Sequence, residues 1–163
     1  MLTHRRPHAA LAALALVALL LAACAPSVLG SRSNPHRLDR DGPLALRAGD
    51  TAYVRVDVPR SAFALTREEL GPRLAPWGEN LARATVTPLF DLRDVIGPDD
   101  WEVGLASAVA YLRSTQREAD LEVLLTVTAP AGARAGGQRL RADIVDQRGR
   151  RHGVEIVVQV AAR

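Results

Sequence analysis

Four segments of the chain alternate apolar and polar residues with a period of two, and each predicts a β-strand with one buried face. They are residues 52–58, 121–128, 139–144 and 154–160. In the second segment, Leu121, Val123, Leu125 and Val127 are expected to face the core. Four strands of this kind predict an all-β domain.

The link between the last two strands, Asp146-Gln147-Arg148-Gly149, predicts an antiparallel hairpin, because a glycine at its end can adopt the left-handed conformation that a short link needs. Residues 129–137 are rich in alanine and glycine and contain Pro130. This segment therefore predicts a turn-rich crossing that continues neither strand.

From Leu121 to Val160 an apolar alternating strand leads into Pro-Ala-Gly-Ala-x-x-Gly at residues 130–136 and then into two final strands. This arrangement resembles the C-terminal half of bacterial immunoglobulin-like and fibronectin-like domains. The resemblance implies an immunoglobulin-like antiparallel β-sandwich, which we expect over residues 44–163. A fold resemblance of this kind implies no activity.

The middle of the chain is harder to interpret. Residues 66–69 form a capping-box pattern, but Gly71-Pro72 limits the helix to about one turn within a connection that runs to about residue 80. Residues 101–113 fit a strand, yet Trp101, Leu105, Ala108 and Leu112 also fall at helical spacing. Gly104 argues against the helix, so a strand is preferred and a helix stays the alternative.

The N-terminus has the pattern of an export signal. Arg5 and Arg6 precede residues 9–23, which are all Ala, Leu or Val. As a helix this run would be about 22 Å long, which is short of the roughly 30 Å of a bilayer's hydrocarbon core. The run has the length of the apolar part of a signal peptide.

The apolar run ends in Leu21-Ala22-Ala23-Cys24, which resembles the lipobox of bacterial lipoproteins. The resemblance implies that residues 1–23 are a cleaved signal peptide and that Cys24 is lipidated. It places the protein outside the cytoplasm, with acyl chains anchoring it to the cell membrane or the outer membrane.

Residues 24–43 mix Ser, Gly, Pro and charged residues, which is the composition of a flexible tether. The nineteen residues that follow Cys24, residues 25–43, would span roughly 24 Å if flexible. Within this segment Asp39-Arg40-Asp41-Gly42 is interpreted as a solvated turn, because a calcium loop would need further acidic ligands downstream.

Composition excludes several classes of function. All 21 basic residues are Arg, so lysine chemistry is excluded, and a single cysteine excludes a disulfide scaffold. Without Arg5 and Arg6 the chain has 19 arginines against 18 acidic residues, which argues against nucleic acid as a partner.

No set of residues predicts an active site, a metal site or a cofactor. His36 and His152 are interpreted as exposed loop residues, and neither lies near a nucleophile motif. The adjacent acids Glu68-Glu69 and Asp99-Asp100 are interpreted as helix-capping or turn residues rather than as a catalytic pair. We therefore do not expect an enzyme.

The chain is expected to act as an interaction or structural module that contacts an envelope protein. The alternative is binding of an anionic lipid or polysaccharide. Trp77 is the one aromatic residue in an expected exposed loop; its default interpretation is packing against the sandwich, and contact with a ligand or partner is the alternative. Arg134, Arg139, Arg141, Arg148, Arg150 and Arg151 form a cluster whose default interpretation is a solvated strand face. The candidate contact residues are Trp77, Arg139, Arg141, Arg148, Arg150 and Arg151.

Overall fold

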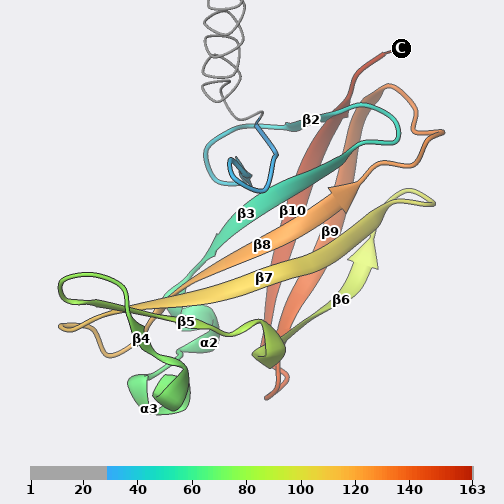
Figure 1. Ribbon diagram of the computed structural model, residues 1–163. Helices are drawn as coiled ribbons and strands as arrows, with labels where there is room; N and C mark the ends of the chain where they lie inside the picture. Colours follow the sequence, from blue (N-terminus) through green and yellow to red (C-terminus); the bar gives the residue numbers. More distant parts are fainter. Residues whose placement is uncertain (1–28, 163) are drawn as a thin grey trace, which may run out of the picture.

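The computed structural model describes residues 29–162, which form two β-sheets packed face to face (Figure 1). We call them sheet A and sheet B. Sheet A has the strand order β1-β3-β8-β7-β5-β4, and sheet B has the order β2-β10-β9-β6. The expected all-β sandwich is confirmed.

The strands of sheet A are β1 (His36–Arg37), β3 (Thr51–Val58), β4 (Ala75–Pro76), β5 (Leu81–Thr85), β7 (Glu102–Arg113) and β8 (Asp120–Thr128). The strands of sheet B are β2 (Leu44–Leu46), β6 (Phe90–Ile96), β9 (Gly136–Asp146) and β10 (Arg151–Val160). All four strands predicted from the period-two pattern are present. Each is longer than its pattern by at least one residue.

The strand order also agrees with the expected immunoglobulin-like arrangement. The neighbours β3-β8-β7 and β10-β9-β6 correspond to strands B-E-D and G-F-C of that fold. Two features depart from the expectation. The short edge strands β1 and β2 pair in parallel with β3 and β10, and the β4–β5 hairpin widens sheet A beyond β7.

The core lies between the two sheets and is built from the apolar positions of the alternating strands. Leu121, Val123, Leu125 and Val127 are each at most 4% exposed, as predicted. From sheet B they meet residues such as Ile144, which is fully buried. Trp101, which begins the segment of uncertain type, is half-buried and packs against this core.

Residues 102–113 form a strand, so the helical alternative is wrong. The strand has a register shift between Leu105 and Ser107 in its pairing with β8. Gly104 packs tightly against the neighbouring strand, because a Cβ atom there would lie 2.8 Å from the Thr126 hydroxyl oxygen. The spacing of apolar residues that looked helical arises partly from this irregular register.

The predicted β9–β10 hairpin and the predicted capping box are both present. In the β9–β10 hairpin, Gly149 has a φ of +80° and the Asp146 amide donates to the Arg150 carbonyl. The capping box is complete in α3 (Arg67–Leu70), where the Thr66 and Glu69 side chains each accept from the other's backbone amide. The remaining short helical segments are α2 (Arg60–Phe63), η1 (Gly71–Arg73) and η2 (Thr87–Leu89).

The expected tether is wrong over residues 29–43, because this segment belongs to the fold. The Tyr53 amide donates to the Gly30 carbonyl (2.7 Å), and the Leu38 amide donates to the Arg55 carbonyl (3.1 Å). The imidazole of His36 is 2% exposed and its Nε2 donates to the Gly42 carbonyl (3.0 Å). His36 is therefore a packing residue and not an exposed loop histidine.

The domain thus begins by Gly30, well before the expected boundary at residue 44. The signal peptide, the lipobox and Cys24 lie outside the described residues. Within residues 29–162 no helix is long and apolar enough to span a membrane.

Candidate functional site

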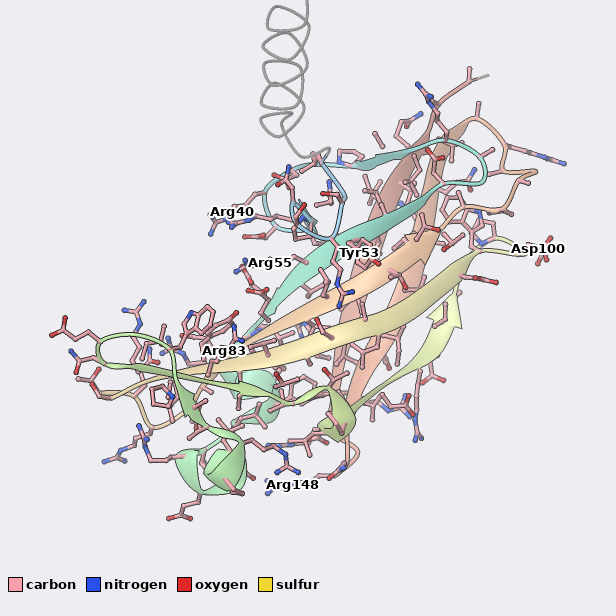
Figure 2. The ribbon with its side chains drawn as sticks, viewed as in Figure 1. Arg40, Tyr53, Arg55, Arg83, Asp100 and Arg148 are labelled. Atoms are coloured by element: carbon pink, nitrogen blue, oxygen red, sulfur yellow. The ribbon has the colours of Figure 1, made fainter. Side chains whose placement is uncertain are left out.

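The most distinctive surface of the described chain is the side of sheet A that faces away from sheet B, which we call the outer face. Alternation along β3, β5, β7 and β8 places one set of apolar residues in the core and most of the polar and aromatic residues on this side, together with the half-buried Val109 and Leu124. Tyr53, Arg55 and Arg83 lie along it (Figure 2). All three are half-buried by their neighbours.

Trp77 and Arg83 form the aromatic part of this face. The Arg83 guanidinium lies over the indole, 3.6 Å from the ring centroid, which is a cation–π contact. The Trp77 amide donates to the Leu81 carbonyl (2.9 Å), so the backbone of the β4–β5 loop is also fixed. The indole is nevertheless 52% exposed, so this side chain is held in place while its surface stays open to solvent.

Tyr111 extends the aromatic part toward the middle of the sheet. It lies directly opposite Arg83 in the pairing of β5 with β7, so both side chains are on the outer face. Burial raises the pKa of the Tyr111 phenol, and the nearby Glu122 carboxylate raises it further. At neutral pH the phenol therefore keeps its proton and can donate a hydrogen bond.

A network of ion pairs occupies the rest of the face. Arg55 on β3 contacts two carboxylates, Asp57 Oδ1 at 3.0 Å and Glu122 Oε2 at 2.8 Å. Beside it, Arg60 donates to both oxygens of Asp120, at 2.5 and 3.1 Å. Bidentate pairing of this kind fixes the orientation of the guanidinium plane.

These ion pairs line an open groove of about 1120 Å³. Its charged lining consists of four arginines and four acids: Arg40, Arg55, Arg60, Arg113, Asp57, Glu118, Asp120 and Glu122. Tyr111 belongs to the lining as well, and it lies opposite Arg83 in the pairing of β5 with β7. The Trp77–Arg83 contact therefore lies next to the groove, although neither residue lines it. The groove as a whole is polar and electrically balanced.

The arginine-rich end predicted from the sequence does not form an uncompensated basic patch. Arg139 and Arg141 share the exposed face of β9, as expected, but both pair with Glu155 on β10, at 3.3 and 3.0 Å. Three further arginines are also paired: Arg148 with Glu69, Arg150 with Asp146, and Arg151 with both Asp94 and Asp143. Arg134, in the loop before β9, is exposed.

Asp146 organises the turn of this hairpin. Its side chain is 6% exposed and accepts from the backbone amides of Arg148 (3.0 Å) and Arg150 (2.8 Å) and from Arg150 Nε (2.7 Å). Burial opposes ionisation of this carboxylate, but the hydrogen bonds and charge of Arg150 outweigh burial and lower its pKa. Nearby, the hydrogen bond from the Thr66 amide, aided by Arg148, lowers the pKa of Glu69.

The adjacent acids and the histidine considered in the sequence do not form a common site in the structure. Glu69 caps α3 while Glu68 is exposed beside it. Asp100 lies at the tip of the β6–β7 link, far from α3 (Figure 2). Burial lowers the pKa of His152, which is half-buried rather than exposed. No group of three or more His, Cys, Asp or Glu residues in the described chain could hold a metal ion.

Sequence reasoning selected Trp77 but missed its partners Arg83, Tyr111 and Arg55. The available signal was the presence of aromatic and charged residues at alternate positions of β3 and β7. That signal identifies the outward positions of each strand. It does not show which strands lie side by side, and the order β4-β5-β7-β8-β3 is what joins these residues into one surface.

Fold and surface together define the chain as an immunoglobulin-like β-sandwich with an aromatic and arginine-bearing sheet face. A scan against protein-family models finds no match for the chain, and no curated protein matches it.

Proposed function

We propose that this protein is a lipoprotein of the bacterial cell envelope that acts as a non-catalytic binding or structural module. The observation that carries the proposal is Leu21-Ala22-Ala23-Cys24, which follows an apolar run of signal-peptide length and contains the only cysteine of the chain. In this proposal, acyl chains on Cys24 hold the protein in a membrane, and the sandwich is displayed outside the cytoplasm.

The distance between the lipid and the domain would be short. Gly30 is fixed by hydrogen bonds to Tyr53 and Asn34, so six residue steps separate Cys24 from a fixed point. At about 3.3–3.6 Å per residue, those steps span at most roughly 20 Å. An anchor at Cys24 would therefore hold the edge of sheet A that carries β1 close to the bilayer.

This geometry supports a binding role for the outer face. Strands β1 and β4 are at opposite edges of sheet A, five strand spacings apart, or about 24 Å. Trp77 follows β4. With β1 next to the lipid, the Trp77 end of the outer face would lie at the edge farthest from the anchor, where it is open to the envelope.

The anchor is tested by changing Cys24→Ala and partitioning cells in Triton X-114. The unmodified protein should enter the detergent phase, whereas the variant should enter the aqueous phase. Ser27→Ala, which leaves the lipobox intact, is the matched control and should behave as the original chain does. Detergent partitioning that Cys24→Ala leaves unchanged would falsify the anchor.

A partner protein and a ligand are the two candidate targets of the module. Crosslinking in intact cells that recovers a stable protein neighbour supports the first. The second is favoured by one observation, the exposed and immobilised indole of Trp77. The pairing of Arg139, Arg141 and Arg150 with carboxylates favours Trp77 over the arginine-rich end as the contact point.

A further inference from the structure

We propose that the outer face of sheet A, from Trp77 through Arg83 and Tyr111 to the Arg55–Glu122 pair, binds a chain of neutral sugars. The inference rests on the proposed role as a binding module and names its ligand. A surface that binds sugars must offer apolar ring faces together with fixed hydrogen-bond donors and acceptors.

The ring faces are supplied by Trp77 and Tyr111. A pyranose ring has C–H faces that pack against aromatic rings, and indole and phenol rings combine an apolar body with a polar tip. The Trp77 indole is 52% exposed yet oriented by Arg83, 3.6 Å from its centroid. Because the ring is already oriented, little side-chain freedom is lost when a ligand stacks on it.

The donors and acceptors are supplied by the ion pairs. Sugar hydroxyls both donate and accept, so they match a surface on which guanidinium groups and carboxylates alternate. Arg55 lies between Asp57 and Glu122 at 3.0 and 2.8 Å, and Arg60 is held by Asp120. These groups are already fixed by one another, which gives a rigid pattern for a ligand to meet.

Charge balance indicates that the ligand is neutral. Four arginines and four acids line the groove, and three of the arginines are paired with acids that line it or adjoin it. A polyanion would gain affinity from uncompensated basic charge, as nucleic acids do, and this groove offers no net excess. A neutral chain avoids the repulsion that the four acids would impose on an anion.

Charge distribution also favours a sugar chain over a protein. Charged residues are depleted at the centre of protein interfaces, where apolar and aromatic residues concentrate. Here the Arg55–Glu122 ion pair joins β3 to β8 within the face, and Trp77 lies at its edge. Four strand spacings separate β4 from β3, about 19 Å, so the face can accommodate several consecutive sugar units.

The test measures retention of the full-length protein, solubilised in detergent, on immobilised glycans. The neutral set consists of chitin, glucan, mannan and galactan, and the anionic set consists of heparin and polygalacturonate. Retention on at least one neutral glycan is expected. Trp77→Ala should weaken it at least about tenfold, because truncating an aromatic residue on which a ligand stacks has an effect of this size.

Two variants separate binding from folding. Trp77→Phe keeps a ring and should retain part of the binding. Ile96→Ala removes an apolar side chain that is 65% exposed on the opposite sheet, and it should leave retention unchanged. Far-ultraviolet circular dichroism should show the same strand content in all variants, because both sites are exposed.

Three results would overturn the proposal: retention on none of the neutral glycans, retention on heparin or polygalacturonate alone, or retention that Trp77→Ala does not weaken. A protein neighbour captured through Tyr111 or Trp77 in cells, without glycan retention, would overturn it in favour of a protein partner. Failure of the anchor is a separate outcome. It appears as aqueous partitioning of the unmodified chain and does not alter glycan retention in detergent.

Discussion

Two surfaces of this protein carry arginines, and the chemistry of their partners separates them. At the β9–β10 hairpin, Arg139, Arg141 and Arg150 each pair with a carboxylate of the same hairpin. On the outer face of sheet A, Arg83 instead stacks on Trp77. The hairpin arginines neutralise carboxylates of their own hairpin. Arg83 instead orients the Trp77 indole, which stays exposed to solvent.

This difference shows why the density of arginines in a sequence is a poor guide to a binding site. The hairpin has the higher density but presents compensated charge. The outer face also carries paired arginines, among them Arg55 and Arg60, but it combines them with an exposed aromatic ring and an open groove. If this contrast holds, changes in the hairpin should lower stability, whereas changes on the outer face should affect binding.

The largest effect is expected at Asp146. Asp146→Ala removes an acceptor of three hydrogen bonds and leaves Arg150, which is 32% exposed, without its carboxylate. The free energy of unfolding, measured by urea denaturation, should fall by about 2–4 kcal/mol. The matched control is Asp91→Ala on β6, whose side chain is 67% exposed, and it should change stability by less than about 0.5 kcal/mol.

Equal losses for Asp146→Ala and Asp91→Ala would mean that the hairpin turn does not depend on its buried carboxylate. The distinction between a hairpin that stabilises the fold and an outer face that binds a ligand would then lose its main support.

The next effect is a loss of stability in acid. The pKa values of Glu69 and Asp146 are lowered in the folded state, so the unfolded chain takes up protons first as the pH falls. The stability they contribute is present above the unfolded pKa values, near pH 4, and is lost as the pH falls through the lower folded values. Urea midpoints measured from pH 7 to pH 3 should fall steeply at the acidic end.

The same titration contains a separate step for His152. Burial lowers the pKa of this imidazole, so its contribution to stability is lost as the pH falls below about 6.5. His152→Gln should flatten the curve between about pH 7 and pH 5 and leave the steeper acidic part intact. A curve that His152→Gln leaves unchanged would show that the group titrates alike in the folded and unfolded chains.

A smaller effect is expected on the outer face. Arg83→Ala removes the cation–π contact, which at an exposed site is worth about 0.5–1 kcal/mol of folding free energy. The Trp77 indole should then be less ordered. Acrylamide quenching in a Trp101→Phe background, where Trp77 is the only tryptophan, should increase. Arg83→Lys is the matched control, because it keeps the charge and loses the planar stacking group.

Quenching of Trp77 that does not change in Arg83→Ala would mean that the indole is held by its loop alone. Arg83 would then contribute nothing to the presentation of the ring.

The sequence was sufficient to predict the elements that are determined by residues adjacent to one another in the chain. The strand over residues 120–128 was predictable because alternate residues bury Leu121 to Val127, and the hairpin because Gly149 can take a positive φ. The capping box at Thr66 and Glu69 is equally local. In each case the pattern and the structure depend on the same few adjacent residues.

Residues 29–43 could not be predicted because backbone groups hold them. Gly30 and Leu38 bind β3 through main-chain hydrogen bonds, which leave no pattern of side chains in the sequence. His36 is buried by a partner six residues away, the Gly42 carbonyl, in a segment whose composition is that of a linker. Composition describes the average of a segment and not the hydrogen bonds of one residue.

The candidate site was only partly predictable for a related reason. Trp77 could be selected as an exposed aromatic residue from its flanking Pro76 and Gly78. Arg83 and Tyr111 could not be joined to it, because the register that pairs them depends on the two-residue strand β4 and on β5. Strands this short have too few residues to show an alternating pattern.

The smallest effects are expected for the exposed arginines of β9, and they provide the sharpest test of the comparison. Arg139→Ala and Arg141→Ala should each change the unfolding free energy by less than about 0.5 kcal/mol, because both side chains are largely exposed and share Glu155. Neither change should weaken retention on a neutral glycan for which Trp77→Ala weakens it. The five paired arginines of this end of the molecule face five carboxylates, those of Glu69, Asp94, Asp143, Asp146 and Glu155. Because this surface has no excess of positive charge, binding to phosphatidylglycerol vesicles should also stay unchanged. If Arg141→Ala weakens vesicle binding severalfold, the hairpin arginines act on a partner despite their pairing, and the division between the two surfaces fails.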